Sequence, residues 1–215
     1  VVTSASANTL SQRGLSTAHY MDMLAYHAFD YYRDILGYAN WSPVMGRWLS
    51  SLKNQQAFDS NMDGEDDVFP DENLARENMQ LFSIGLFVLW SDGSLKLGND
   101  GLPIPTYTND DIQEFARVLT GQSFAKYADN KEQWGVSSLD ELLENTNFNK
   151  NNGSQYYGHQ YNYPMKMFGI YHDPGVKIMA GGKEIDNTAI ADLDMRGIAD
   201  IEAAMDWLAG KPGDG

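Results

Sequence analysis

Residues 70–85 read Pro70-Asp71-Glu72-Asn73-Leu74-Ala75-Arg76-Glu77-Asn78-Met79-Gln80-Leu81-Phe82-Ser83-Ile84-Gly85, and this stretch decides the fold class. Pro is favoured at the first position of a helix, so Pro70-Asp71 predicts a helix start. The longest apolar run of the chain, Leu81 to Trp90, indicates a buried helix end. We therefore expect one helix from about 70 to about 90.

The segments on either side also favour helices. Tyr20, Leu24, His27 and Tyr31 recur on one face of a helix. Thr108 with Asp111 resembles a capping box. The expected helices cover residues 17–38, 42–52, 109–120, 137–144 and 196–209.

Two stretches predict other structure. Turn signals at 91–93 and 99–101 bracket Ser94 to Gly98 and indicate a short exposed β-hairpin. From Asn145 to Tyr171 the sequence is rich in Asn, Tyr and Gly, which indicates a long loop that is functional or partly disordered. The expected fold is mainly α: a single irregular multi-helix domain over residues 1–215, with a short β-hairpin and long loops.

Composition narrows the function classes. Thirty acidic and fifteen basic residues give a net charge of −15, which disfavours nucleic acid and anionic membranes as partners. No apolar run reaches the roughly 20 residues of a membrane-spanning helix. The absence of Cys excludes disulfides and thiolate chemistry. Because the chain has no initiator Met and no signal peptide, we interpret it as an internal fragment of a longer protein.

An acidic loop covers residues 59–72, with seven acids and no base. Its oxygen-bearing side chains stand at positions 1, 3, 5 and 9, with Gly64 at position 6, which matches the first half of an EF-hand loop. Pro70 stands where the bidentate Glu of position 12 belongs. A solvated acidic turn is the alternative. The predicted cofactor is Ca²⁺, and its expected ligands are Asp59, Asn61, Asp63 and Asp67.

No complete catalytic motif is present, so His residues are the scarcest candidates for chemistry. His27 lies on an aromatic face, where a core His bonded to a neighbour is the simpler interpretation. His172 precedes Asp173, Pro174 and Gly175, and this turn is either structural or a catalytic pair on a rigid corner.

Five blocks together resemble a known bacterial family, the domain of unknown function 1800. They are 27–34 (HAFDYYRD), 43–49 (PVMGRWL), 70–85, 107–121 (YTNDDIQEFARVLTG) and 172–177 (HDPGVK). The similarity runs from about residue 20 to 182. It implies a large, mostly helical, exported bacterial protein that continues beyond this chain and is often encoded beside a sulfatase-like partner protein. The acidic loop is then an insertion before the core motif.

The resemblance also implies candidate site residues, because they lie within its motifs. The hypothetical catalytic set is His27, Glu77, His172 and Asp173. The hypothetical substrate-binding set is Arg76 and Asn73, with Tyr156 and Tyr157 from the long loop. Arg76 and Glu77 have a structural alternative, a buried ion pair that holds the helix in place.

Two functions remain open. The first is a calcium-binding structural or interaction module of a secreted, periplasmic or cell-surface protein, with other segments of the longer chain as partners. The second is an exported hydrolase or lyase that acts on an extracellular polysaccharide or another polymer. The first needs only the acidic loop, whereas the second needs His27, Glu77 and His172 to meet in one cleft.

Overall fold

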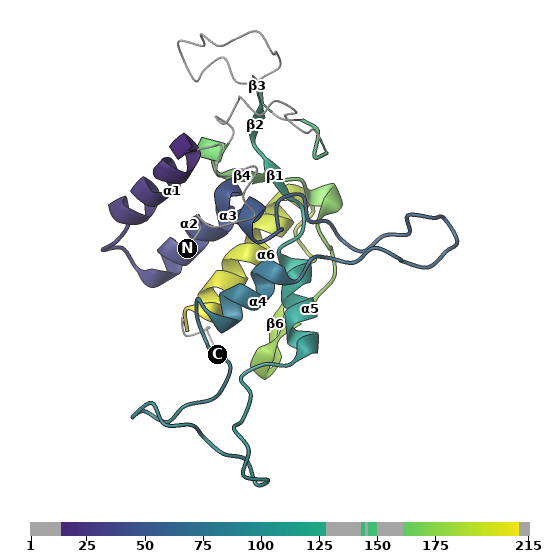
Figure 1. Ribbon diagram of the computed structural model, residues 1–215. Helices are drawn as coiled ribbons and strands as arrows, with labels where there is room; N and C mark the ends of the chain where they lie inside the picture. The colour runs from purple at the N-terminus through teal and green to yellow at the C-terminus, as the bar shows by residue number, and fades with distance from the viewer. Residues whose placement is uncertain (1–13, 128–142, 145, 150–160, 211–215) are drawn as a thin grey trace.

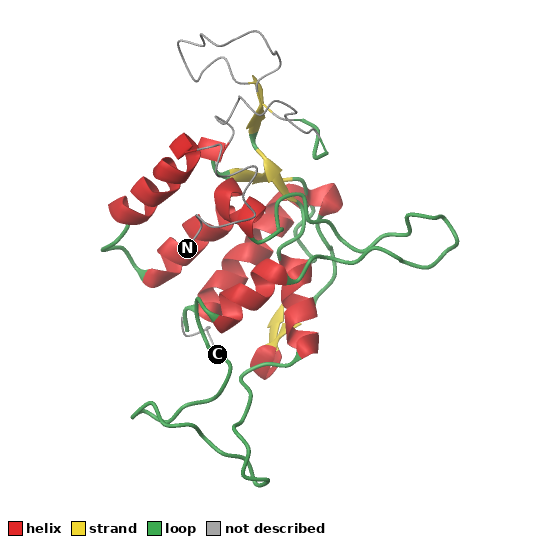
Figure 2. Cartoon of the chain, in the orientation of Figure 1, coloured by secondary structure: helices red, strands yellow, loops and turns green. Residues whose placement is uncertain are grey.

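The computed structural model describes residues 14–127, 143–144, 146–149 and 161–210. A helical body carries two long projecting loops (Figures 1 and 2). The helices are α1 (Gly14–Tyr26), α2 (Tyr32–Trp41), α3 (Pro43–Trp48), α4 (Asn73–Gln80), α5 (Asn109–Val118) and α6 (Leu193–Leu208), with 3-10 turns η3 (Gly169–Tyr171) and η4 (Ala180–Gly182). The expectation of a helix-rich, irregular fold is confirmed. Short strands between the helices make it more mixed than expected.

Six short strands form three antiparallel pairs in the described part of the chain. The pairs are β1 (Gln122–Phe124) with β4 (Met165–Met167), β2 (Lys126–Tyr127) with β3 (Leu143–Glu144), and β5 (Lys177–Met179) with β6 (Lys183–Ile185). Leu143 and Glu144 are therefore extended, where a helix end was expected, and the rest of that expected helix lies outside the described residues. Strand β4 and turn η3 also give order to part of the expected 145–171 loop.

The first expected helix is two helices. Residues 27–30 form a turn, and α2 begins at Tyr32 after Tyr31 takes an extended conformation. The break turns α2 onto α6, where Arg33 donates to Asp206 over 2.6 Å and also pairs with Glu202. A continuous helix would carry Arg33 past these carboxylates.

Helix α4 ends ten residues earlier than expected. Ser83 Oγ donates to the Asn78 carbonyl, and Gly85 adopts φ +71°, a conformation that glycine takes without steric cost. The following Phe87-Val88-Leu89-Trp90 run is β-branched and aromatic, which favours extended backbone. The apolar run that suggested a buried helix end is in fact the start of an exposed arm.

This apolar arm, residues 84–106, consists of three similar units that repeat every eight residues. Gly85, Gly93 and Gly101 recur at the same place in each unit, all with positive φ. The middle residues of the units, Val88, Lys96 and Ile104, form a closed ring of backbone hydrogen bonds. Lys96 donates to Val88, Val88 to Ile104, and Ile104 to Lys96, each over 2.9–3.0 Å. The expected hairpin at 94–98 is thus the second of three extended segments, which are joined by isolated β-bridges.

Capping holds the two helices that frame the core. Thr108 and Asp111 form the expected capping box at α5. Asp192 caps α6 by accepting from the Met195 backbone N–H, so this helix begins three residues before the expected start. One apolar core lies between α2, α4, α5 and α6, and its most buried members include Leu74, Met79, Phe115, Ile201 and Met205.

A buried amide pair fixes how α2 meets α4. Asn40 Nδ2 donates to Asn78 Oδ1 over 3.1 Å, and Asn78 Nδ2 donates back to Asn40 Oδ1 over 2.8 Å. Both residues are almost fully buried, so a shifted helix would leave two amides without partners. None of the helices in the described ranges has the length and apolar character that crossing a membrane requires.

Candidate functional site

The His172 turn is set by η3 and by a close approach to the end of α5. Gly121 has φ +85°, and a Cβ at this position would lie 2.9 Å from the His172 Cβ. Only glycine therefore lets the chain leave α5 and pass against the turn. This approach brings Thr120 under the imidazole ring.

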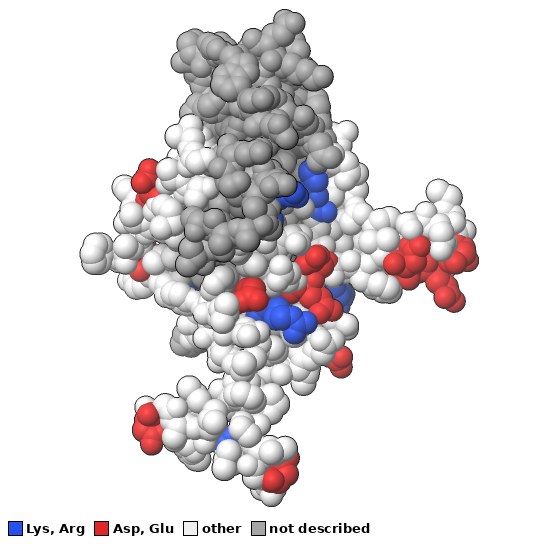
Figure 3. All heavy atoms as spheres, viewed as in Figure 1, with Lys and Arg blue, Asp and Glu red and all other residues white. Residues whose placement is uncertain are grey.

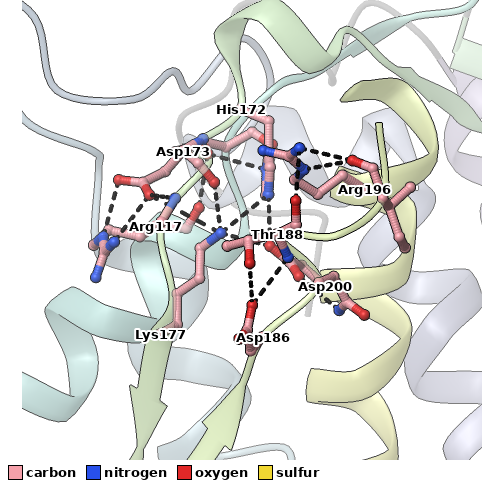
Figure 4. Close-up of polar contacts among 12 residues, drawn as sticks. Arg117, His172, Asp173, Lys177, Asp186, Thr188, Arg196 and Asp200 are labelled. Carbon is pink, nitrogen blue, oxygen red and sulfur yellow. Dashed lines mark hydrogen bonds and ion pairs between the residues drawn. The ribbon is translucent and has the colours of Figure 1, made fainter. Parts of the chain in front are cut away.

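His172 belongs to a buried polar cluster (Figure 4). Its Nδ1 lies 3.0 Å from the Thr120 carbonyl oxygen, which can only accept, so Nδ1 donates there. Its Nε2 lies 2.9 Å from Asp200 Oδ2, which also accepts from Lys177 Nζ. Asn187 Nδ2 donates to the other Asp200 oxygen over 2.8 Å. The ring is thereby held on both sides by protein groups.

Burial and ion pairing shift the pKa values of the charged groups in this cluster in opposite directions. The side chains of Lys177 and Asp200 are 0% and 2% exposed. Burial alone would raise the pKa of Asp200, but hydrogen bonds from His172, Lys177 and Asn187 outweigh it and lower the pKa below its usual range. For Lys177, burial outweighs the attraction of Asp200 and lowers the pKa. Lys177 Nζ also donates to the Asp173 backbone carbonyl, so the ammonium group is held by more than its ion pair with Asp200.

A second ion pair closes the outer side of the turn. Arg117, at the end of α5, holds both Asp173 oxygens over 2.9 Å and both Glu114 oxygens over 2.7–2.8 Å. The hydrogen bonds that Arg117 donates to Asp173 are the main cause that raises the pKa of Arg117. A Cβ on Gly175 would meet the guanidinium at 2.6 Å, so glycine makes room for this bidentate contact. Asp173 is thus a partner of Arg117 and does not pair with His172.

The structure places the other candidate catalytic residues in different surroundings. His27 lies on the turn after α1, where Nδ1 is 2.6 Å from Asp30 Oδ2 and the ring packs on Tyr38. Glu77 lies on α4 with a buried Oε2 that has no hydrogen-bond partner among the described residues. Neither His27 nor Glu77 is a bonding partner of His172.

The expectation that Arg76 and Glu77 are buried and bonded, to each other or to the His172 turn, is wrong for Arg76. Arg76 donates to Glu72, four residues earlier, over 3.1 Å, and the Arg76 side chain is 41% exposed. The orphan oxygen of Glu77 has another neighbour, Tyr107, whose buried hydroxyl also has no partner in the described part of the chain. Burial raises the pKa of Tyr107; Arg76 opposes this shift, and the Glu77 carboxylate adds to it.

The remaining candidate binding residues are separate from this cluster. Asn73 is exposed at the start of α4, where its backbone N–H donates to Asp71 Oδ1. Tyr156 and Tyr157 lie outside the described residues. Their neighbours Tyr161 and Tyr163 line an apolar cavity of about 630 Å³ beside α1, together with Tyr20, Met23, Tyr38 and Trp41.

The acidic loop projects from the body as a hairpin whose base is the Phe58–Val68 bridge (Figure 3). Asp59 accepts backbone N–H groups of Met62, Asp63 and Gly64, at 2.6–3.3 Å. Asp67 accepts the N–H and hydroxyl of Ser60.

These hydrogen bonds order the loop around its own amides. Those from the Gly64 backbone N–H, followed by Met62 and Asp63, lower the pKa of Asp59, and those from Ser60 lower the pKa of Asp67. Asn61 and Asp63 each accept an N–H two residues ahead. Within the ranges that the structure describes, no three His, Cys, Asp or Glu side chains are grouped closely enough to hold a metal ion. Calcium binding at Asp59, Asn61, Asp63 and Asp67 would therefore require their oxygens to move closer together.

Sequence reasoning missed the residues that complete the His172 cluster, which are Thr120, Lys177 and Asp200. A signal was available for Asp200. Gly197, Asp200, Ile201 and Ala204 fall at i, i+3, i+4 and i+7 of one helix, so this carboxylate stands in the stripe that faces the core. A charge in such a stripe calls for a buried partner of opposite charge.

Comparison with known proteins adds the family. No curated protein and no solved structure matches the chain. The family model described as protein of unknown function (DUF1800) matches residues 1–213, which is nearly the whole chain. This agrees with the resemblance carried by the five sequence blocks, so the chain belongs to the DUF1800 family.

Proposed function

We propose that this chain is a calcium-stabilised structural or interaction module of an exported protein. The main support for a structural role is that protein groups surround and hydrogen-bond the His172 ring. His172 is 2% exposed, and each ring nitrogen faces a protein oxygen at 2.9–3.0 Å. A buried ring that is held on both sides supports a role in packing the turn against α5 and α6.

The calcium part of the proposal is supported by the acidic loop. Asp59 and Asp67 are exposed carboxylates with lowered pKa values, so both carry their charge at neutral pH. Gly64 has φ +99°, which gives the sharp turn that an EF-hand-like loop needs at its sixth position. A divalent ion would relieve the repulsion among these acids by drawing Asp63 and Asp67 inward.

The extracellular location is supported by the expected affinity. Calcium sites of extracellular modules bind at roughly 0.1–1 mM, and such a loop would be filled only outside the cytosol. Its exposure, with no part of the body packed over it in Figure 3, favours weak binding of this kind.

Thermal unfolding with and without calcium tests the proposal. Millimolar calcium should raise the melting temperature by roughly 3–5 °C relative to chelator, because an ion bound only by the folded state stabilises it. Asp63→Ala should remove most of this shift.

Asp92→Ala is the matched control. Like Asp63, Asp92 precedes a glycine and accepts the N–H two residues ahead, but it lies in the apolar arm. It should leave the calcium shift unchanged. Identical melting curves in chelator and in 5 mM calcium would refute calcium binding, as would an equal loss in both variants.

The enzyme alternative has less support. It needs His27, Glu77 and His172 in one cleft, and the partners of His172 are instead Thr120, Lys177 and Asp200. What favours it is the aromatic cavity beside α1, where Tyr161 and Tyr163 offer flat faces of the kind that sugars stack on.

A further inference from the structure

The aromatic cavity beside α1 has the size of a small-molecule site. Its walls come from α1, from the junction of α2 and α3, from residues 161–167 and from α6. Its volume of about 630 Å³ lies within the range of roughly 300–1,000 Å³ that is usual for ligand pockets. Filled with solvent alone, this space would hold roughly 20 water molecules at about 30 Å³ each, most of them against apolar walls.

The walls of the cavity favour an aromatic ligand. Four tyrosines and Trp41 line it, together with Met23, Met165 and Met167. Methionine sulfur makes favourable contacts with aromatic rings, and aromatic rings pack on one another edge to face or offset. These contacts are available to a flat ring system but not to a saturated molecule of the same size.

Polar groups are few in the interior of the cavity. His19 and Asp194 are exposed and therefore stand at its rim. The buried polar side chains of the lining are the hydroxyls of Tyr20 and Ser42, whose residues are 4% and 9% exposed. A sugar carries a hydroxyl on almost every carbon and loses free energy when these groups are buried without partners. The lining therefore suits a molecule with one or two polar groups better than it suits a sugar.

Both interior hydroxyls are available to a ligand. Neither of them forms a hydrogen bond with another residue in the described ranges: Ser42 precedes α3 without capping it, and no hydrogen bond contributes to the pKa of Tyr20. Burial raises the pKa of Tyr20 to about 12, so its hydroxyl is protonated at neutral pH and can both donate and accept. A buried hydroxyl without a partner is unfavourable, and a ligand hydroxyl or N–H group would supply one.

Charge excludes one further class of ligand. The chain has a net charge of −15, and Asp194 stands at the rim of the cavity, so an anionic molecule would be repelled. We propose that the aromatic cavity beside α1 binds a neutral, flat aromatic molecule whose hydroxyl or N–H group pairs with Tyr20. No residue of the acidic loop lines this cavity, so this proposal does not depend on calcium.

Isothermal titration of the 215-residue chain with 2-naphthol tests the proposal. The dissociation constant should be about 10–100 µM, as expected for a small ligand in an apolar cavity. Decahydro-2-naphthol keeps the hydroxyl and the fused rings but is saturated, and it should bind at least about three-fold more weakly.

Removal of one hydroxyl tests the role of Tyr20. Tyr20→Phe should weaken the binding of 2-naphthol by about three- to ten-fold, and it should not weaken the binding of 2-methylnaphthalene, which has no hydroxyl to lose. Tyr107→Phe is the matched control, because the Tyr107 hydroxyl is also buried without a partner in the described part of the chain but does not line the cavity. It should leave both affinities unchanged.

Filling the cavity tests the location of the site. Met23→Trp places a larger ring in the cavity from α1 and should weaken the binding of 2-naphthol by at least about ten-fold. Met21→Trp is the same change on the same helix, at a residue that is 54% exposed and outside the lining, and it should leave binding unchanged. Circular dichroism should show that all variants remain folded.

Several results would overturn the proposal. A wild-type chain that binds no 2-naphthol at about 1 mM would do so, and so would binding that Met23→Trp leaves intact or that Tyr20→Phe and Tyr107→Phe weaken equally. Decahydro-2-naphthol that binds as tightly as 2-naphthol would contradict the preference for aromatic rings. Tighter binding of methyl β-glucoside than of 2-naphthol would assign the cavity to a sugar and would favour the enzyme alternative instead.

Discussion

The His172 cluster and the apolar arm are opposites. The cluster buries Lys177 and Asp200 at 0% and 2% exposure, whereas the arm leaves Leu97 and Leu102 at 58% and 63%. In these two regions, therefore, charged side chains are buried and leucines are exposed. In the first region every charge meets an opposite charge within the same chain, and in the second most of the large apolar side chains stay 38–63% exposed.

The difference separates residues that specify the fold from residues that are available to a partner. A buried charge is costly when unpaired, so Asp200 defines where α6 must lie against the His172 turn. An exposed leucine contributes little to the folding of its own chain, because folding removes little of its surface from water. The same contrast predicts very different costs of substitution in the two regions.

The largest effect is expected at the buried ion pair. Lys177→Met leaves the Asp200 carboxylate without its ammonium partner and should lower the free energy of unfolding by about 3–5 kcal/mol, as measured by urea denaturation. The double variant Lys177→Met/Asp200→Leu should recover much of this loss, because no unpaired charge remains. A double variant less stable than Lys177→Met would mean that the two residues act independently, which would contradict their role as a pair that specifies the fold.

An intermediate effect is expected on acid stability. Burial alone would raise the pKa of Asp173, but the hydrogen bonds from Arg117 and Gly175, together with the charges of Arg117 and Lys177, outweigh it and hold the pKa below its ordinary value of 3.8. Below about pH 3.8 the unfolded chain takes up a proton at Asp173 before the folded chain does. The stabilisation is complete above this pH and is lost as the pH falls through the folded pKa.

The measurement is the difference in unfolding free energy between the wild type and Asp173→Asn. It should be largest near pH 6 and shrink toward pH 2. A difference that does not change with pH would show that the Asp173 charge contributes nothing to folding.

The smallest effect is expected in the arm. Leu102→Ala, at 63% exposure, should change the free energy of unfolding by less than about 0.5 kcal/mol. The same change at Leu74, which is 1% exposed on α4, should cost roughly 2–5 kcal/mol. Both are compared by urea denaturation at concentrations where the chain is monomeric. A cost above 1 kcal/mol at Leu102 would mean that the arm belongs to the folding core.

Local signals in the sequence predicted part of this fold. The Thr108–Asp111 capping box was recognisable because both hydrogen bonds lie within four residues. The end of α4 was not, because Leu81 to Trp90 suits a buried helix as well as a strand, and periodicity cannot separate the two in a short apolar run. The equal spacing of Gly85, Gly93 and Gly101 was the available sign of three extended units.

The sequence identified two residues of the candidate site, but it did not identify the residues with which they pair. His172 and Asp173 are where the chain concentrates polar contacts, yet their partners Asp200 and Arg117 lie 28 and 56 residues away in sequence. Such pairings depend on how α5 and α6 pack on the turn, which no local pattern contains. Arg76 shows the reverse error, since two neighbouring motif residues of opposite charge invite a pairing that the helix geometry does not make.

The closed ring at the middle of the arm makes its length discrete. Each of its three units forms a backbone hydrogen bond with each of the other two, and at the base of the arm the Thr106 N–H donates to the Leu86 carbonyl. Deletion of one unit would leave the two remaining extended segments with unpaired backbone N–H and C=O groups. Deletion of the whole arm would instead join two residues that already lie side by side. We therefore expect insertions and deletions at this position to add or remove all three units together, without changing the helical body.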